Sequence, residues 1–159
     1  MVRRPPLPRK DFRADQLEIR FERAFPADVT AMEAIVHEIM GIVTQAKCAI
    51  EAQWEVELAL REALANAVLH GAKGDSAKQV AVSVACADRV GVLIVVRDPG
   101  EGFDPNCVPS PLIGENVYSN HGRGIFLINQ IMDEVRFEKG GTEIHMLKRP
   151  SGPAAQSEA

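Results

Sequence analysis

The hydrophobic periodicity of this 159-residue chain changes several times, and these changes constrain its fold more than any other feature. Apolar and charged residues alternate over 17–22, which predicts a half-buried strand. After Pro26 and Asp28, apolar residues recur every three or four positions up to residue 43, the spacing of an amphipathic helix. Residues 56–69 are rich in alanine, leucine and glutamate and predict a second helix, which ends where Gly71 can take a left-handed cap.

The second half of the chain adds strands, a long irregular stretch and a third helix. Residues 80–84 and 90–96 predict two strands joined by a turn at Asp88 and Arg89. No period holds over 99–122, and a loop of that length is usually functional or disordered. Helical spacing resumes at Ile125, and residues 135–138 and 144–147 flank two glycines as a hairpin. We therefore predict an α+β fold, a two-layer sandwich of one mixed, mostly antiparallel sheet with about three helices on one face.

The cysteines and apolar runs indicate the compartment in which this domain is expected and whether it spans a membrane. A chain of this length can bury roughly 70% of its unfolded surface, so one core needs no disulfide or metal. Cys48, Cys86 and Cys107 are odd in number and widely spaced, which argues against a disulfide framework or zinc site and favours a reducing, cytoplasmic compartment. The longest apolar run, Val92–Val96, is far shorter than the roughly 18 residues of a membrane span. We expect no membrane segment and no secretion signal.

The charge is unevenly distributed along the chain. The formal net charge is −4, but residues 1–13 hold five basic residues and one acidic residue, so the remainder carries 13 Lys and Arg against 21 Asp and Glu. An acidic body repels phosphates, so we expect no direct nucleic-acid binding. Residues 1–14 are expected to be a disordered, basic, Pro-rich arm and 150–159 a disordered tail, with a single domain over 15–149.

Four short patterns could carry chemistry, and each has a plain structural explanation when taken alone. Glu62 and Asn66 lie one helical turn apart on one helix face, as a solvent-exposed polar edge also would. Asp98 starts an Asp-Pro-Gly-Glu-Gly segment directly after the most apolar strand, where a common turn would look the same. Gly122-Arg123-Gly124 opens a helix whose first amides could bind an anion, or is an ordinary loop-to-helix junction. Gly141-Thr142 alone indicates only a turn.

Several other site types are excluded by the same residues. The Asp98 segment lacks the third glycine of a dinucleotide fingerprint, and no Walker-type Gly-Lys-Ser/Thr sequence occurs. The four histidines show no metal-ligand spacing. No Ser-His-Asp arrangement can be defended from the sequence.

Taken together and in this order, the four patterns resemble the nucleotide-binding (Bergerat) domain of the GHKL ATPase superfamily, which includes gyrase, histidine kinases and MutL. Glu62-x-x-x-Asn66 resembles its N box, Asp98-x-Gly100-x-Gly102 its first glycine box and Gly122-x-Gly124 its second, with Pro105–His121 as the ATP lid. The match is closest to the stand-alone anti-sigma factor serine-protein kinases. It rests on Glu62–Gly71, Gly122–Ile128 and Met132–Val135, and covers roughly residues 25–148.

The resemblance implies a role for each matching residue. Asp98 would accept a hydrogen bond from the adenine amino group, with support from Thr142. Asn66 would hold Mg²⁺, and Glu62 would be the catalytic base that takes the proton of a serine hydroxyl. Relatives often carry an arginine shortly before the second glycine box, whereas here the arginine lies between its glycines, which leaves the efficiency of phosphoryl transfer open. The residues expected to bind nucleotide are Asn66, Asp98, Gly100, Gly102, Gly122, Arg123, Gly124, Ile125 and Thr142.

The resemblance also implies a function and partners. The expected protein is a cytoplasmic Mg·ATP-dependent serine kinase that phosphorylates a STAS-domain antagonist and sequesters a sigma factor, with ATP or ADP selecting the partner. A free sheet edge near residues 17–22 allows a homodimer. One alternative is a binding module without catalysis, in which ATP only orders a partner surface. The catalytic half of a histidine kinase and a domain without nucleotide are weaker alternatives, the former because no room remains for dimerisation helices.

Overall fold

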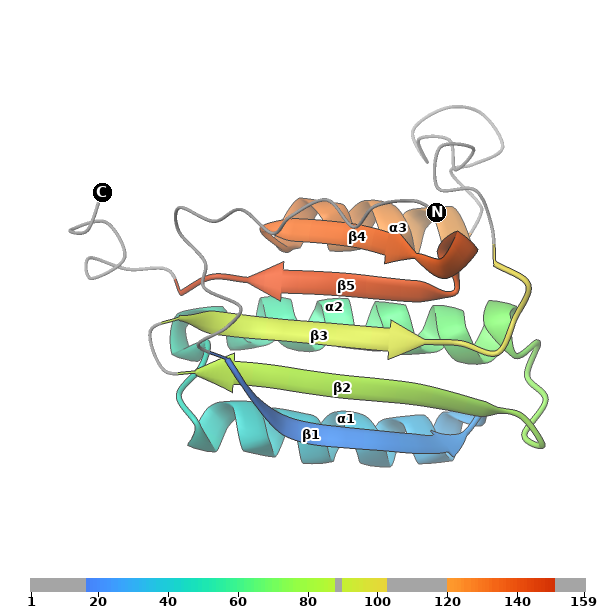
Figure 1. Ribbon diagram of the computed structural model, residues 1–159, viewed down its shortest axis with the longest axis horizontal. Helices are drawn as coiled ribbons and strands as arrows, with labels where there is room; N and C mark the ends of the chain where they lie inside the picture. The colour runs from blue at the N-terminus through green and yellow to red at the C-terminus, as the bar shows by residue number, and fades with distance from the viewer. Residues whose placement is uncertain (1–16, 88–89, 103–119, 151–159) are drawn as a thin grey trace.

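The computed structural model describes residues 17–87, 90–102 and 120–150. The predicted arm over 1–14, the predicted turn at Asp88 and Arg89, and most of the predicted lid and tail lie outside these residues. Cys107 also lies outside them. All helices and strands labelled in Figure 1 fall within the three described ranges.

Five strands form one antiparallel sheet (Figure 1). They are β1 (Glu18–Pro26), β2 (Gln79–Ala87), β3 (Gly91–Arg97), β4 (Glu134–Glu138) and β5 (Glu143–Lys148). Hydrogen-bonded neighbours follow the order β1-β2-β3-β5-β4, and each of these pairings is antiparallel. Strands β4 and β5 are the predicted hairpin. The predicted α+β sandwich is confirmed, with a sheet that is antiparallel throughout the described residues.

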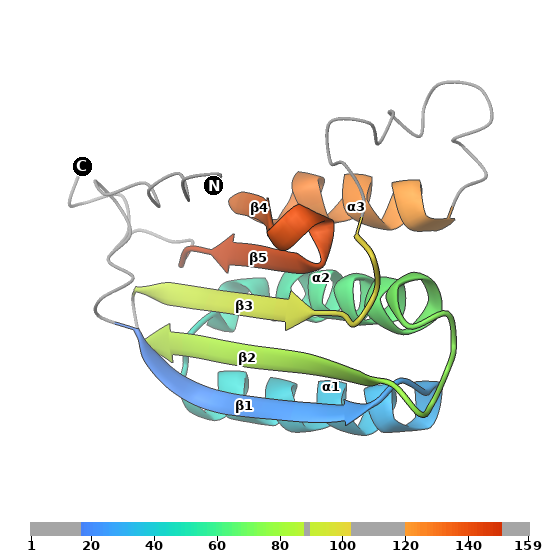
Figure 2. The same cartoon turned by 45° about the vertical axis from the view of Figure 1, so that its right-hand side comes forward.

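Three helices cover one face of this sheet. They are α1 (Val29–Gln45), α2 (Gln53–Asn66) and α3 (Asn120–Ile131). Figures 1 and 2 show α1 behind β1 and β2, α2 behind β3, and α3 behind β4. Helix α1 begins after Asp28, whose side chain accepts a 2.7 Å hydrogen bond from Ala31 N and so satisfies a free amide. Within the described ranges, every helix is too short or too polar to cross a membrane.

One hydrophobic core fills the space between the helices and the sheet. Alternate residues of β2 and β3 are buried against the helices, as period-two strands require. Ile39 of α1, Leu60 of α2, Ile94 of β3 and Met146 of β5 are all fully buried. Burial of each such side chain contributes roughly 1.5–3 kcal/mol, which makes this core the main source of stability. Short turns η2 (Ile50–Ala52), η3 (Ala67–Gly71) and η6 (Lys139–Gly141) connect the larger elements.

The predicted left-handed cap at Gly71 is wrong. The chain leaves α2 through the π-helical turn η3, and the left-handed residues are Lys73 (φ 55°) and Gly74 (φ 69°). Gly71 is needed for space instead, because a Cβ atom there would lie 2.6 Å from Asp98 Oδ1. This glycine marks a contact with a segment distant in the sequence, which the local pattern could not reveal.

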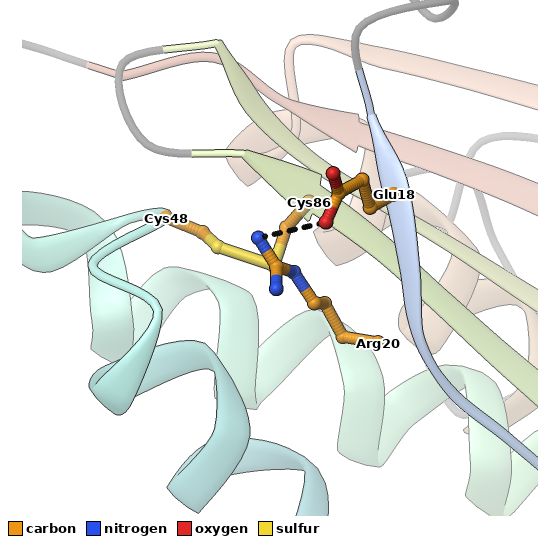
Figure 3. The surroundings of a disulfide bond; sticks show 4 residues. All are labelled: Glu18, Arg20, Cys48 and Cys86. Atoms are coloured by element: carbon orange, nitrogen blue, oxygen red, sulfur yellow. Dashed lines mark ion pairs between the residues drawn. A yellow bond between two sulfur atoms is a disulfide. The ribbon is translucent and has the colours of Figure 1, made fainter.

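Cys48 and Cys86 form a disulfide bond, although the number and spacing of the cysteines argued against a disulfide framework (Figure 3). Cys48 follows α1 and Cys86 lies near the end of β2, with their Cα atoms 5.8 Å apart and both side chains buried. The pairing spans 38 positions, so only the packing of α1 against the sheet reveals it. Glu18 and Arg20 of β1 lie beside it as a 3.3 Å ion pair. The number and spacing of the cysteines therefore no longer support a reducing compartment.

Candidate functional site

A cavity of about 610 Å³ opens where β3 ends, β5 begins and α2 passes into η3. This volume is typical of sites for small organic ligands. Its walls come from five segments: the end of α2 with η3, the η3–β2 connection, β3 with the loop after it, the first turns of α3, and the β4–β5 hairpin. The lining residues are Ala63, Asn66, Ala67, His70, Gly71, Lys73, Lys78, Val96, Asp98, Pro99, Gly100, Glu101, Gly102, Ile125, Phe137, Gly141, Thr142 and Ile144.

Asp98 is the half-buried carboxylate of this cavity. It directly follows β3, and its amide donates a 2.9 Å hydrogen bond to Thr142 O, which continues the β3–β5 pairing by one step. Its Oδ1 accepts a 2.7 Å hydrogen bond from Gly100 N. Burial raises the pKa of Asp98, and the Gly100 amide partly opposes this change. The result is a fixed acceptor in a partly dry pocket, suited to an N–H group of a flat heterocycle.

The glycines around Asp98 let three backbone segments meet. A Cβ atom on Gly100 would lie 2.6 Å from Gly71 O, so neither glycine has room for a side chain. Gly102 has φ 82°, and a Cβ there would lie 2.9 Å from Gly140 C. The loop after β3 is thus packed between η3 on one side and η6 on the other. This packing fixes the backbone that surrounds the Asp98 carboxylate.

Apolar side chains provide the other part of the cavity wall. Val96 of β3, Phe137 of β4 and Ile144 of β5 line it from the sheet, and Ala63 and Ala67 line it from α2 and η3. Small alanines on the helix and branched or aromatic side chains on the sheet leave an apolar slot. An aromatic ring system can enter such a slot while its polar edge meets Asp98.

Glu62 and Asn66, one turn apart on α2, both lie against the start of α3. A Cβ atom on Gly124 would stand 2.9 Å from Glu62 Oε2 and 3.2 Å from Asn66 Nδ2. The structure thereby brings together two sequence patterns separated by more than 50 positions. Asn66 lines the cavity, whereas Glu62 is not among the described residues that line it.

The first two turns of α3 hold the remaining predicted residues. Helix α3 begins at Asn120, so Gly122 and Arg123 lie inside its first turn rather than before it. Gly124 is buried, Arg123 is exposed and Ile125 lines the cavity. Amides in the first turn of a helix lack intrahelical acceptors and attract anions, which suits this end of the cavity to phosphate.

The donor set near Asn66 suits a magnesium ion carried by phosphates. Among the described residues, no group of three or more His, Cys, Asp or Glu side chains could form a protein cage for a metal. Mg²⁺ commonly keeps several waters and takes one or two protein oxygens together with substrate phosphates. The single amide oxygen of Asn66 fits that arrangement.

Three basic residues on the cavity wall were not identified as site residues from the sequence. His70 follows Asn66 by one turn, and this spacing was a visible signal for it. Lys73 and Lys78 belong to the η3–β2 connection, and no sequence pattern singles them out. They enter the wall because the left-handed backbone at Lys73 turns the chain back towards β2. Their charges favour an anionic ligand.

Comparison with known proteins gives consistent results. Residues 25–148 match the histidine kinase-like ATPase domain. The chain is 30% identical over 145 residues to the serine-protein kinase RsbW of Staphylococcus epidermidis, an alignment that covers 84% of this chain and 86% of that protein. It is 29% identical over 115 residues to the anti-sigma F factors of Bacillus thuringiensis (strain Al Hakam) and Bacillus cereus (strain AH187), covering 69% of this chain and 78% of each relative.

Proposed function

This chain belongs to the histidine kinase-like ATPase family, and we propose that it is an ATP-dependent serine-protein kinase that acts as an anti-sigma factor. The observation that carries the proposal is the joining of three parts around one cavity. These parts are the half-buried acceptor Asp98, the cavity-lining Asn66 with Glu62 beside it against Gly124, and the amide-bearing first turn of α3. The names of the similar proteins supply the reaction and the class of partner.

Adenine occupies the apolar slot in this proposal. Asp98 accepts a hydrogen bond from the adenine amino group, and Thr142 lies beside it on the neighbouring strand. Gly100 and Gly102 keep the backbone open for the flat ring. Because the Gly100 amide already occupies one lone pair of Oδ1, the carboxylate is held in one orientation and accepts from the ligand with its free lone pairs.

The phosphates lie at the other end of the cavity. The amides of the first turn of α3 that have no intrahelical acceptor, that of Gly122 among them, bind their oxygens, and Arg123 adds positive charge at this helix end. The Asn66 side chain holds the magnesium ion that accompanies the phosphates. When bound, the ion would neutralise the negative charge that develops on the phosphate oxygens during phosphoryl transfer.

Glu62 is the catalytic base in this proposal. It lies one turn before Asn66 on the same helix face and beside Gly124, at the phosphate end. From there it takes the proton of a serine hydroxyl on a partner protein as the hydroxyl oxygen attacks the terminal phosphorus of ATP. The bond to the ADP oxygen breaks, and ADP leaves.

The proposed partners are a STAS-domain antagonist, which carries the serine, and a sigma factor, which the protein sequesters. The serine and the sigma factor follow from the names of the similar proteins, a serine-protein kinase and anti-sigma F factors, and the STAS-domain antagonist follows from the family resemblance of the sequence. The location would be cytoplasmic, where ATP is available. Strand β1 is an edge of the sheet, and a homodimer could use it, although its charges and Pro26 restrict strand addition.

The test is incubation of the purified protein with Mg·ATP and a candidate STAS-domain partner, followed by phosphoserine detection by mass spectrometry. The proposal expects one phosphorylated serine on the partner, transfer that depends on Mg²⁺, and a lower rate for Glu62→Gln. Absence of transfer to any such partner, with ATP binding intact, would contradict the kinase activity.

Two observations favour a second function, an ATP-dependent binding module without catalysis. Glu62 does not line the described cavity, and the residues before Gly122 are Asn120 and His121 rather than an arginine. In this alternative, ATP changes partner affinity without phosphorylation. Asn120→Arg would then be expected to restore transfer, and the same phosphoserine assay measures it.

A further inference from the structure

We propose that Glu143 is a positioning residue for the nucleotide site, which holds Asp98 and Thr142 in place from the opposite face of the sheet. This inference rests on the proposed function, because its readout is the binding of adenine nucleotide. Glu143 itself does not line the cavity among the described residues, whereas Asp98, next to its partner Arg97, and Thr142, next to Glu143, both do. It therefore acts through Asp98 and Thr142 rather than on the ligand.

The Glu143 carboxylate connects β5 to the end of β3. Glu143 and Arg97 are direct partners in the antiparallel β3–β5 pairing, so their side chains share one face of the sheet. Arg97 Nε donates a 2.7 Å hydrogen bond to Glu143 Oε2. The residues that follow Arg97 and precede Glu143 in the chain are Asp98 and Thr142, and these are joined by the 2.9 Å backbone hydrogen bond. The ion pair thus lies one residue away from the site on both strands.

The same carboxylate also reaches the turn between β4 and β5. Lys139 Nζ lies 3.5 Å from Glu143 Oε2, and Lys139 O accepts a 2.9 Å hydrogen bond from Thr142 Oγ1. Gly140, next in this turn, packs against Gly102. Glu143 therefore draws together the two segments that form the Asp98 side of the cavity, the end of β3 and the turn η6.

The Glu143 carboxylate is buried, and each of its oxygens has a polar partner. Its side chain is 7% exposed, although it lies on the sheet face away from the three helices. Its second oxygen, Oε1, lies 2.6 Å from Nε2 of the buried His145. Burial alone would raise the pKa of Glu143, but hydrogen bonds and charges from Arg97 and His145 lower it to about 2. The carboxylate is charged at neutral pH and both of its oxygens have partners.

Desolvating a carboxylate is costly, and a buried ion pair often adds little net stability compared with apolar packing. A role in fixing geometry therefore explains this network better than a role in stability alone. The mutual effect of residues in one such network is typically large enough to change an equilibrium roughly 2- to 150-fold. We expect a change in nucleotide affinity within the lower part of this range.

The experiment measures the Kd of a fluorescent ATP analogue together with the free energy of unfolding. Glu143→Gln keeps the size of the side chain but removes its charge, and we expect roughly 5- to 20-fold weaker binding. Arg97→Ala should give a similar loss, and Arg97→Lys, which keeps the cation, a smaller one. Arg97 is half exposed in its side chain, so its variants carry the test if Glu143→Gln does not fold.

Two controls separate positioning from stability. Glu33→Gln removes an Arg–Glu pair of similar length, between Glu33 and Arg61, which is exposed and does not line the cavity, and should leave Kd unchanged. Val43→Ala weakens the core under α1 and should lower stability without changing Kd. Replacement of a residue that shapes the site should instead change Kd.

A double-mutant cycle with Asp98→Asn provides the decisive readout. If Glu143 acts through Asp98, Glu143→Gln should change Kd by less than about 2-fold in the Asp98→Asn background. Equal loss in both backgrounds, or a wild-type Kd for Glu143→Gln in the Asp98 background, would overturn the inference while leaving the proposed function intact. Failure of the wild type to bind the analogue would instead contradict the proposed function.

Discussion

Gly124 of α3 stands directly against the Glu62 carboxylate of α2, so closely that a Cβ atom on the glycine would lie 2.9 Å from Glu62 Oε2. The contact also includes Asn66, whose Nδ2 would be 3.2 Å from the same atom. Two helices thus meet through a glycine at the point where the catalytic base and the magnesium-holding amide are proposed to act. Any side chain at this position must displace one of them.

Gly124→Ala should therefore lower both nucleotide affinity and phosphoryl transfer. The added methyl group pushes the end of the Glu62 or Asn66 side chain out of place. Because these flexible ends can shift at little cost, the free energy of unfolding should rise by up to roughly 1 kcal/mol, the usual gain from alanine in a helix, while the site loses its geometry. Gly41→Ala is the matched control, because Gly41 lies in α1 with no atom within 4 Å of an added Cβ. It should raise the free energy of unfolding by about 0.5–1 kcal/mol and leave binding unchanged. Unchanged ATP binding and transfer in Gly124→Ala would contradict the contact.

Asp98→Asn should weaken ATP binding by roughly 1.5–3 kcal/mol, since the acceptor loses its charge and presents a donor to the adenine amino group. Its effect on stability should be neutral or favourable. The folded-state pKa of Asp98 is raised, so the charged form disfavours folding once the pH exceeds the ordinary Asp value near 3.9, and asparagine removes this cost at pH 7. Calorimetry and urea unfolding measure the two effects. A less stable variant with normal ATP affinity would contradict both.

Glu62→Gln should lower serine phosphorylation by about 10²- to 10⁴-fold with ATP affinity near the wild-type value, because the amide keeps the size but cannot take the proton. Asn66→Ala should instead lower Mg·ATP affinity and turnover together, since the ion and the phosphates bind as one unit. Single-turnover phosphorylation and calorimetry separate these two patterns. Wild-type transfer by Glu62→Gln would rule out Glu62 as the base.

Glu143 should make the protein sensitive to acid. Its pKa is lowered from 4.5 to about 2, so its contribution to stability is complete above pH 4.5 and is lost as the pH falls towards 2. Urea unfolding across this range should show a steeper loss of stability for the wild type than for Glu143→Gln. Parallel curves for the two proteins would show that the Arg97 and His145 contacts do not stabilise the charged form.

Reduction of the Cys48–Cys86 disulfide should lower the free energy of unfolding by up to about 4 kcal/mol, the loop-closure value for cysteines 38 positions apart. Urea unfolding with and without dithiothreitol measures this difference. Cys86→Ala is the control and should not respond to the reductant. A wild type that is equally stable in both conditions, with free thiols by mass spectrometry, would show that the bond does not form in solution.

The strands and helices could be predicted from the sequence because their signals are local. Alternation over β2 and β3 and the three-to-four spacing over α1 reflect which face each element buries, and the structure places these elements as expected. The end of α2 was misjudged because the role of Gly71 depends on Asp98, which comes 27 positions later. A local pattern cannot distinguish a glycine that is needed for a turn from one that is needed for a close contact with a distant segment.

The sequence by itself determined the element types, their order and the residues with the chemistry of a nucleotide site, because these depend on residue type and short spacing. The tertiary structure alone decided which distant residues meet. It placed Gly124 on Glu62, paired Cys48 with Cys86 and joined Arg97 to Glu143 behind the site. Such contacts depend on strand order and helix packing, which bring together positions separated by 38 to 62 residues with no signal in either local segment.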